Sequence, residues 1–123
     1  MQRLSACGPA AALLGIGIAL VPTPAAAHAI VVAASPAVDA QLHGSAIPVL
    51  LRFNSRIDQQ RSRLSLIHAD GSSEALPLAP AESPDSLAAT INGIAPGNYR
   101  LRWQVLAVDG HITRGDIPFV VAP

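Results

Sequence analysis

Residues 94–105 have the sequence Ile-Ala-Pro-Gly-Asn-Tyr-Arg-Leu-Arg-Trp-Gln-Val, and this stretch decides the fold class. From Tyr99 to Val105, apolar side chains alternate with Arg, Arg and Gln, a period of two that predicts a strand with one buried face. The preceding Pro-Gly-Asn turn gives residues 94–99 the form of a tyrosine corner, in which the phenol hydrogen-bonds to backbone a few residues upstream. Greek-key sandwiches use this device to fix a crossover, so the stretch indicates a β-sandwich or a related barrel.

Six further segments on either side of this strand have a similar character. Each is rich in apolar residues and is bounded by Gly, Pro, Asn, Asp or Ser. They are residues 29–34, 47–53, 63–69, 74–78, 86–91 and 116–121. Pro118 lacks a donor for a strand ladder, so the last strand is expected to be an edge or to bulge there. About seven short strands, with no amphipathic helix of useful length, predict an all-β domain with a Greek-key sandwich or barrel.

Residues 1–27 have the three parts of a secretion signal. Arg3 supplies positive charge, Leu4–Val21 is uncharged and mostly apolar, and Ala25-Ala26-Ala27 provides the small residues that a signal peptidase recognises. A membrane anchor is the alternative, but the apolar run is short for a bilayer, which takes about 20 residues. We therefore expect a cleaved signal peptide and a single mature domain over residues 28–123, exported to the periplasm.

The composition of the mature chain limits its partners and its metal chemistry. Its 96 residues contain seven arginines, no lysine and eight acidic residues, for a formal charge of −1. This balance argues against nucleic acid or an anionic membrane as a partner, since both need a basic surplus. Met1 and Cys7, the only methionine and the only cysteine, precede residue 28. A metal would therefore be held by His, Asp, Glu and the amino terminus, a set that suits Cu(II) and disfavours Cu(I).

Two features could supply such ligands. Cleavage after Ala27 would make His28 the first residue, so that its α-amino group and Nδ1 could chelate one ion in a six-membered ring. The α-amino pKa is ordinarily about 7.7, so its proton is readily released to copper near neutral pH. In the second feature, Asp109-Gly110-His111, the glycine allows Asp109 and His111 to face one point. Two imidazoles, an amine and a carboxylate form the tetragonal N/O set that Cu(II) prefers. A histidine that follows the cleavage site by chance is the alternative.

The mature chain resembles the CopC family of periplasmic copper-resistance and copper-trafficking proteins. The segments that carry the resemblance are His28-Ala29, Ser35–Ala40, Leu50–Phe53, and the run from Tyr99 and Trp103 through Asp109-Gly110-His111 to Phe119–Val121. The resemblance implies a cupredoxin-like (immunoglobulin-like) Greek-key barrel. It also implies one Cu(II) per chain, bound by the amine and imidazole of His28 and the imidazole of His111, with Asp109 ligating or supporting the metal.

The chain departs from the family pattern in two places. The methionine-rich Cu(I) loop of the family has no counterpart between Leu76 and Leu87, which contains no methionine, so a Cu(II)-only form is expected. Asn54-Ser55 stands where many relatives have an acidic residue. The function that the resemblance implies is a monomeric copper carrier or buffer without turnover, which sequesters Cu(II) or delivers it to a separate, CopD-like multi-span membrane transporter.

Two other classes of function stay open. Copper held by an N-terminal histidine and a second histidine is also the core of lytic polysaccharide monooxygenases, but these enzymes need an extended flat surface, often with aromatic residues. The mature chain has four aromatic residues, of which the strand pattern predicts at least two to be buried. A structural or adhesive sandwich without stoichiometric copper is the third class. His43 and His68 are expected at exposed polar positions away from any metal.

Overall fold

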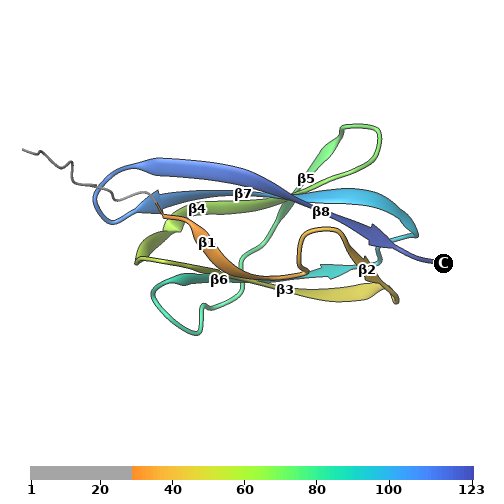
Figure 1. Cartoon of the computed structure of the whole chain (residues 1–123), viewed down its shortest axis with the longest axis horizontal. Helices are drawn as coiled ribbons and strands as arrows, with labels where there is room; N and C mark the ends of the chain where they lie inside the picture. Colours follow the sequence, from red (N-terminus) through yellow and green to blue (C-terminus); the bar gives the residue numbers. More distant parts are fainter. Residues whose placement is uncertain (1–28) are drawn as a thin grey trace, which may run out of the picture.

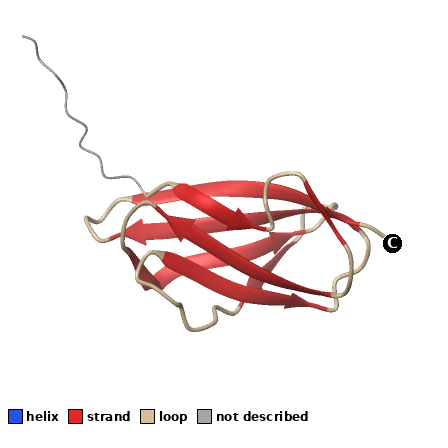
Figure 2. Cartoon of the chain, turned by 60° about the horizontal axis from the view of Figure 1, so that its bottom comes forward, coloured by secondary structure: helices blue, strands red, loops and turns tan. Residues whose placement is uncertain are grey.

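Eight strands and no helix make up the described part of the chain, residues 29–123 of the computed structural model (Figures 1 and 2). The predicted signal peptide and His28 lie outside the described residues. The strands are β1 Val31–Ser35, β2 Ala40–Leu42, β3 Ala46–Phe53, β4 Ile57–Ile67, β5 Ser73–Leu76, β6 Ser86–Asn92, β7 Gly97–Ala107 and β8 Ile112–Val121. Residues 29–123 contain no helix long and apolar enough to cross a membrane.

The strands form two packed sheets, with the orders β1-β3-β6 and β2-β8-β7-β4-β5. Strand β3 pairs with β6, and β4 pairs with β7, so the chain crosses repeatedly from one sheet to the other. Such crossovers between strands that are not neighbours in sequence are those of a Greek-key sandwich. The predicted all-β fold is confirmed in its sandwich form; the sheets stay separate and do not close into a barrel.

One of the eight strands was not predicted. No strand was predicted between residues 34 and 47, but β2 adds three residues, Ala40 to Leu42, in parallel to the end of β8. A three-residue strand has too few positions for a readable alternation, and its partner lies about 80 residues further along the chain. The count of about seven strands is therefore corrected to eight.

The core lies between the two sheets and follows the alternation seen in the sequence. Leu101, Trp103 and Val105 of β7 are buried, and so are Val49, Leu51 and Phe53 of β3. The phenol of Tyr99 donates a hydrogen bond of 2.6 Å to the carbonyl of Ala95, which confirms the predicted tyrosine corner.

Strand β8 has a neighbour on its outer side only near its end. Strand β2 joins β8 only from Phe119 onward, and the Asp39 N–H donates to the Pro118 carbonyl at 2.7 Å. Pro118 thus lies at the last position of β8 before β2 joins it, in keeping with the expectation for a residue without an N–H.

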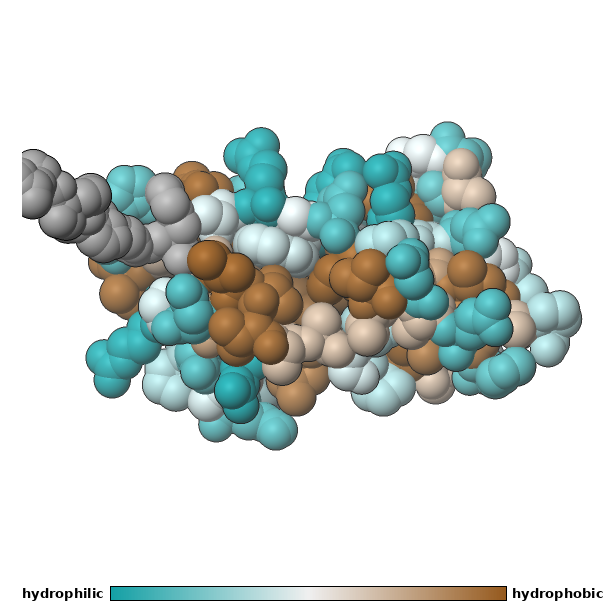
Figure 3. Space-filling view, viewed as in Figure 1, coloured by the Kyte–Doolittle hydropathy of each residue, from teal (hydrophilic) through white to brown (hydrophobic). Residues whose placement is uncertain are grey.

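Figure 3 shows apolar surface over β1 and the turn that follows it. The exposed large apolar residues there are Val32 and Val38, with Leu50 of β3 beside β1.

Candidate functional site

The hairpin between β7 and β8 carries the predicted Asp109-Gly110-His111 motif. The Gly110 N–H donates to the Ala107 carbonyl at 2.9 Å, and the Ala107 N–H donates to the His111 carbonyl at 2.8 Å. These two bonds define a three-residue hairpin loop whose third position requires a positive φ, and Gly110 adopts a φ of 95° there. The glycine thus allows the chain to turn so that Asp109 and His111 lie on the same side.

Asp109 and His111 form a two-point contact. The Asp109 Oδ1 accepts the His111 backbone N–H at 3.0 Å, and Oδ2 lies 3.0 Å from Nδ1 of the imidazole. The backbone and ring hydrogen bonds from His111 hold the pKa of the Asp109 carboxyl below its ordinary value. Because both carboxylate oxygens contact the same residue, Asp109 fixes the orientation of the imidazole and favours a proton on Nδ1, which directs metal binding to Nε2.

The first described residues lie against the same end of the sandwich. The Ala29 carbonyl accepts a hydrogen bond of 3.0 Å from Oγ1 of Thr113, and the Ala29 side chain is buried in the core. Ile30 is held on its other side by Asn54, whose Oδ1 accepts the Ile30 N–H at 2.9 Å and whose N–H donates to the Ile30 carbonyl at 2.9 Å. In Figure 1, β1 begins at the end where β7 turns into β8.

This anchoring places the residue after His28 at the same end of the sandwich as Asp109 and His111. Thr113 lies two residues after His111, and Ala29 directly follows His28 in the sequence. The structure thus places His111, Asp109 and the residue after His28 at one end of the molecule. His28 itself lies outside the described residues, and residues 29–123 contain no cluster of three His, Cys, Asp or Glu side chains that could hold a metal.

Two residues that contribute to this end were not predicted as such. Thr113 and Asn54 anchor the segment after His28, and their partners lie 84 and 24 residues away in sequence. Asn54 was noted only as part of the Asn54-Ser55 pair, in a region where many relatives have an acidic residue. Its position directly after a buried strand was the one local signal, since polar side chains at strand ends often bind neighbouring backbone.

His68 and His43 lie at the other end of the sandwich. His68 follows Ile67, which pairs with Arg100 near the start of β7, whereas Asp109 follows the end of that strand, about 24 Å away at 3.4 Å per residue. The imidazole of His68 contacts Oε1 of Glu74 at 3.1 Å, with its side chain 36% exposed. His43 is exposed in the loop after β2. Neither histidine is part of the candidate site.

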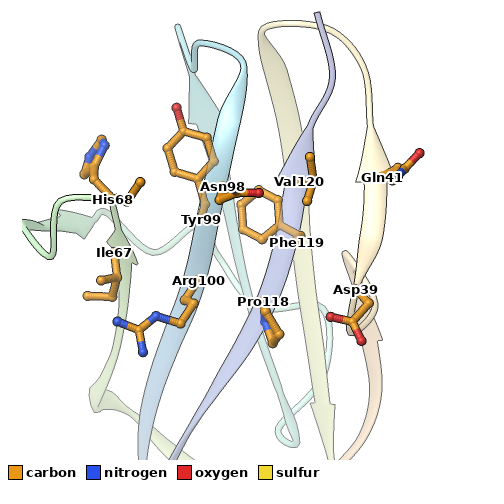
Figure 4. A pocket seen from close by; sticks show the side chains of 11 residues that line it. Asp39, Gln41, Ile67, His68, Asn98, Tyr99, Arg100, Pro118, Phe119 and Val120 are labelled. Carbon is orange, nitrogen blue, oxygen red and sulfur yellow. The ribbon is translucent and has the colours of Figure 1, made fainter.

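The groove beside His68 has no convergent set of metal ligands either. It encloses about 570 Å³ between β2, β8, β7 and β4 (Figure 4). The His68 ring packs edge-on against Tyr99 with centroids 5.5 Å apart, and Tyr99 stacks on Phe119. These ring contacts extend the core toward the surface at the tyrosine corner, which accounts for the position of His68 without a metal.

The arrangement defines an all-β Greek-key sandwich in which the candidate ligands Asp109 and His111 lie at one end, beside the segment that follows the predicted cleavage site. Within that class, the chain belongs to the CopC family: the CopC domain matches residues 31–122.

Solved structures agree with this family. The crystal structure of CopC from Methylosinus trichosporium OB3b is similar with a TM-score of 0.69 and 29% identity, over 78% of this chain and 95% of that one. PcoC from Escherichia coli, described as a methionine-rich copper resistance protein, has a TM-score of 0.60 and 23% identity, over 77% of this chain and 99% of its own, a likeness in fold. No curated protein matches the chain in sequence.

Proposed function

We propose that the mature chain, beginning at His28, is a periplasmic Cu(II)-binding protein. The bound ion would be held by the α-amino group and imidazole of His28 and by Nε2 of His111. The observation that carries this proposal is the hydrogen bond between Thr113 and the Ala29 carbonyl, which ties the neighbour of His28 to β8 two residues from His111. Membership of the CopC family and the described role of PcoC in copper resistance support copper as the metal.

The donors available to the mature chain select the oxidation state. It has neither cysteine nor methionine, whereas PcoC is described as methionine rich. Nitrogen and oxygen donors suit Cu(II) in a tetragonal arrangement, and soft sulfur donors would be needed to favour Cu(I). The chain therefore holds Cu(II) and does not exchange between the two oxidation states at this site.

In this proposal Asp109 acts on the metal through His111. The carboxylate that accepts a ring N–H from a metal-bound histidine fixes the tautomer and raises the basicity of the ligating nitrogen. Both oxygens of Asp109 already contact His111, so a direct bond to the metal would have to break one of these contacts.

A carrier fits this surface better than an oxidative enzyme. Three of the four aromatic side chains are buried, namely Phe53, Trp103 and Phe119. The fourth, Tyr99, lies at the opposite end from His111, so no aromatic platform surrounds the candidate site. We therefore propose that the protein sequesters Cu(II), or delivers it to a separate CopD-like membrane transporter, as a monomer and without turnover.

A Cu(II) titration followed by electron paramagnetic resonance tests the proposal on two proteins. One begins at His28, and the other has a single glycine added before it. The first should bind one equivalent with a nitrogen-rich tetragonal spectrum, and the second should bind much more weakly because its α-amino group is displaced. His68→Ala in the first protein is the matched control and should bind like its parent.

Two results would contradict the proposal. Equal binding by the two proteins would remove the amino terminus from the site. Absence of binding in both proteins would exclude copper as the ligand and would favour a structural β-sandwich.

A further inference from the structure

The outer face of the five-stranded sheet carries a concentration of arginines. Cross-strand pairing places Arg63 of β4, Gln104 of β7 and Arg114 of β8 in one row. The next row consists of Ser65, Arg102 and Asp116, and Arg100 follows on β7. Four of the seven arginines of the mature chain and one of its eight acids lie in these rows. Hydrophilic side chains line the upper outline of Figure 3, where Figure 1 draws β7 and β8.

The single acid of these rows is already engaged. Asp116 accepts two hydrogen bonds from Arg102, at 2.8 and 3.0 Å, and one from Arg100 at 3.3 Å. The Arg102 hydrogen bond is the main cause that lowers the pKa of the Asp116 carboxyl. Asp58, the next acid toward the hairpin, accepts the backbone N–H groups of residues 60 and 61 and contacts Arg61. The acids of this side therefore have partners within the chain.

Arg63 and Arg114 differ from these paired residues. Both are exposed, and neither lies within 4 Å of a carboxylate oxygen among residues 29–123. They flank a groove of about 540 Å³ that also presents Ser65 and Gln104. Their strands are two ladder spacings apart, about 10 Å, a gap that two guanidinium groups can close around a carboxylate.

We propose that this arginine groove docks a carboxylate-rich segment of a partner protein. Arginine binds carboxylates through two parallel hydrogen bonds, and Ser65 and Gln104 can hydrogen-bond to the backbone or side chains of the docked segment. The rows hold three net positive charges on a mature chain whose formal charge is −1, so the attraction is local to this face. Arg114 lies three residues after His111 on β8, about 10 Å along the chain, so a docked partner would lie within about 10 Å of the candidate metal site at its nearest point.

An acidic protein segment suits this face better than an anionic membrane. The exposed large apolar side chains at the hairpin end of this sheet are Val108 and Ile112, and neither lies in the rows that form the groove, so this face offers little for insertion into lipid.

The test uses the mature protein and a peptide of four Glu-Ser repeats, followed by amide NMR spectra at low and at moderate salt. Shifts should gather at Ser65, Gln104 and Gly115, and raising the salt should weaken binding. The double variant Arg63→Ser/Arg114→Ser should bind the peptide about tenfold more weakly. Arg52→Ser/Arg56→Ser is the matched control with the same change of charge, and it should keep the parent affinity within about twofold.

Three results would overturn the proposal. The first is equal weakening by the control pair, because the attraction would then come from total charge. The second is binding of inorganic phosphate as tightly as the peptide at the same amides, which would make the groove a site for small anions. The third is binding to phosphatidylglycerol vesicles that exceeds peptide binding and is lost in Arg63→Ser/Arg114→Ser. None of these measurements depends on copper, so they stand or fall separately from the metal site.

Discussion

The substitution Thr113→Val tests whether the anchored N-terminal segment contributes to copper binding. Valine keeps the branched shape of threonine but cannot donate to the Ala29 carbonyl at 3.0 Å. A single neutral hydrogen bond contributes about 1 kcal/mol net, and a buried carbonyl left without a partner costs about 1–3 kcal/mol. Ala29 is only 2% exposed, so the carbonyl that loses its donor belongs to a residue with little access to water.

These values translate into two measurable changes. If the free energy that holds the N-terminal segment in place contributes about 1 kcal/mol to metal binding, its loss should raise the dissociation constant for Cu(II) about fivefold. The free energy of unfolding should fall by about 1–3 kcal/mol, and each kcal/mol lowers the melting temperature by about 4–8 °C in a domain of this size. Isothermal titration with a competing chelator and thermal denaturation of the apoprotein measure the two effects.

The control is Thr90→Val on β6, an exposed threonine whose side chain makes no hydrogen bond within residues 29–123. It should leave both quantities unchanged. Asn54→Ala, which removes the acceptor of the Ile30 N–H, should act in the same direction as Thr113→Val. If both anchor variants lose stability but bind Cu(II) as tightly as the parent, the reasoning that links the anchor to the metal site is refuted.

Three further substitutions give distinct expectations. Asp109→Asn keeps the shape but removes the charge that orients the imidazole, and should weaken Cu(II) binding about 10–100-fold by chelator competition, with little change in melting temperature. Gly115→Ala would place a methyl group 2.7 Å from Cζ2 of Trp103, and should destabilise the fold by about 1–3 kcal/mol in urea denaturation. Asp116→Asn should remove part of the acid sensitivity. Arg102 lowers the pKa of the Asp116 carboxyl, so the stability that this ion pair contributes is present above the unfolded pKa near 3.9 and is lost as the pH falls through the folded value. Because both side chains reach solvent, this contribution to the free energy of unfolding is at most about 1 kcal/mol in acid titrations.

The sequence predicted those parts of the fold that depend on local pattern. The tyrosine corner and the inward face of β7 were found because alternation and turn residues lie within a dozen positions of one another. Strand β2 was missed because its three residues acquire strand character only by pairing with β8. The length of β4 was also underestimated: its first half carries a bulge after Asp58, which breaks the alternation that a pattern search relies on.

The candidate site was also predicted only in part. Donor chemistry and the bend allowed by Gly110 predicted that Asp109 and His111 face one point, and in the hairpin the two side chains are in contact. The role of Thr113 could not be predicted, because the bond that gives it meaning spans 84 residues. A prediction from ligand types can name which atoms suit a metal, but only the fold decides which backbone groups hold those atoms in place.

The proposed function requires the chain terminus to serve as a metal ligand. Terminal residues ordinarily fray, and ordering a backbone residue costs about 1–2 kcal/mol, a cost that a metal site built on a free end would have to overcome. In this sandwich the Ala29 side chain belongs to the core, and Ala29 and Ile30 together make three hydrogen bonds to β8 and to the residue after β3. Folding thus orders the chain up to the residue after His28, so that a metal would need to fix only one more residue. A glycine added before His28 should therefore leave the melting temperature of the apoprotein unchanged while it weakens Cu(II) binding. A chain that begins at Ile30 should have a lower melting temperature and should also bind Cu(II) weakly, because it lacks the core contact of Ala29 as well as the chelate.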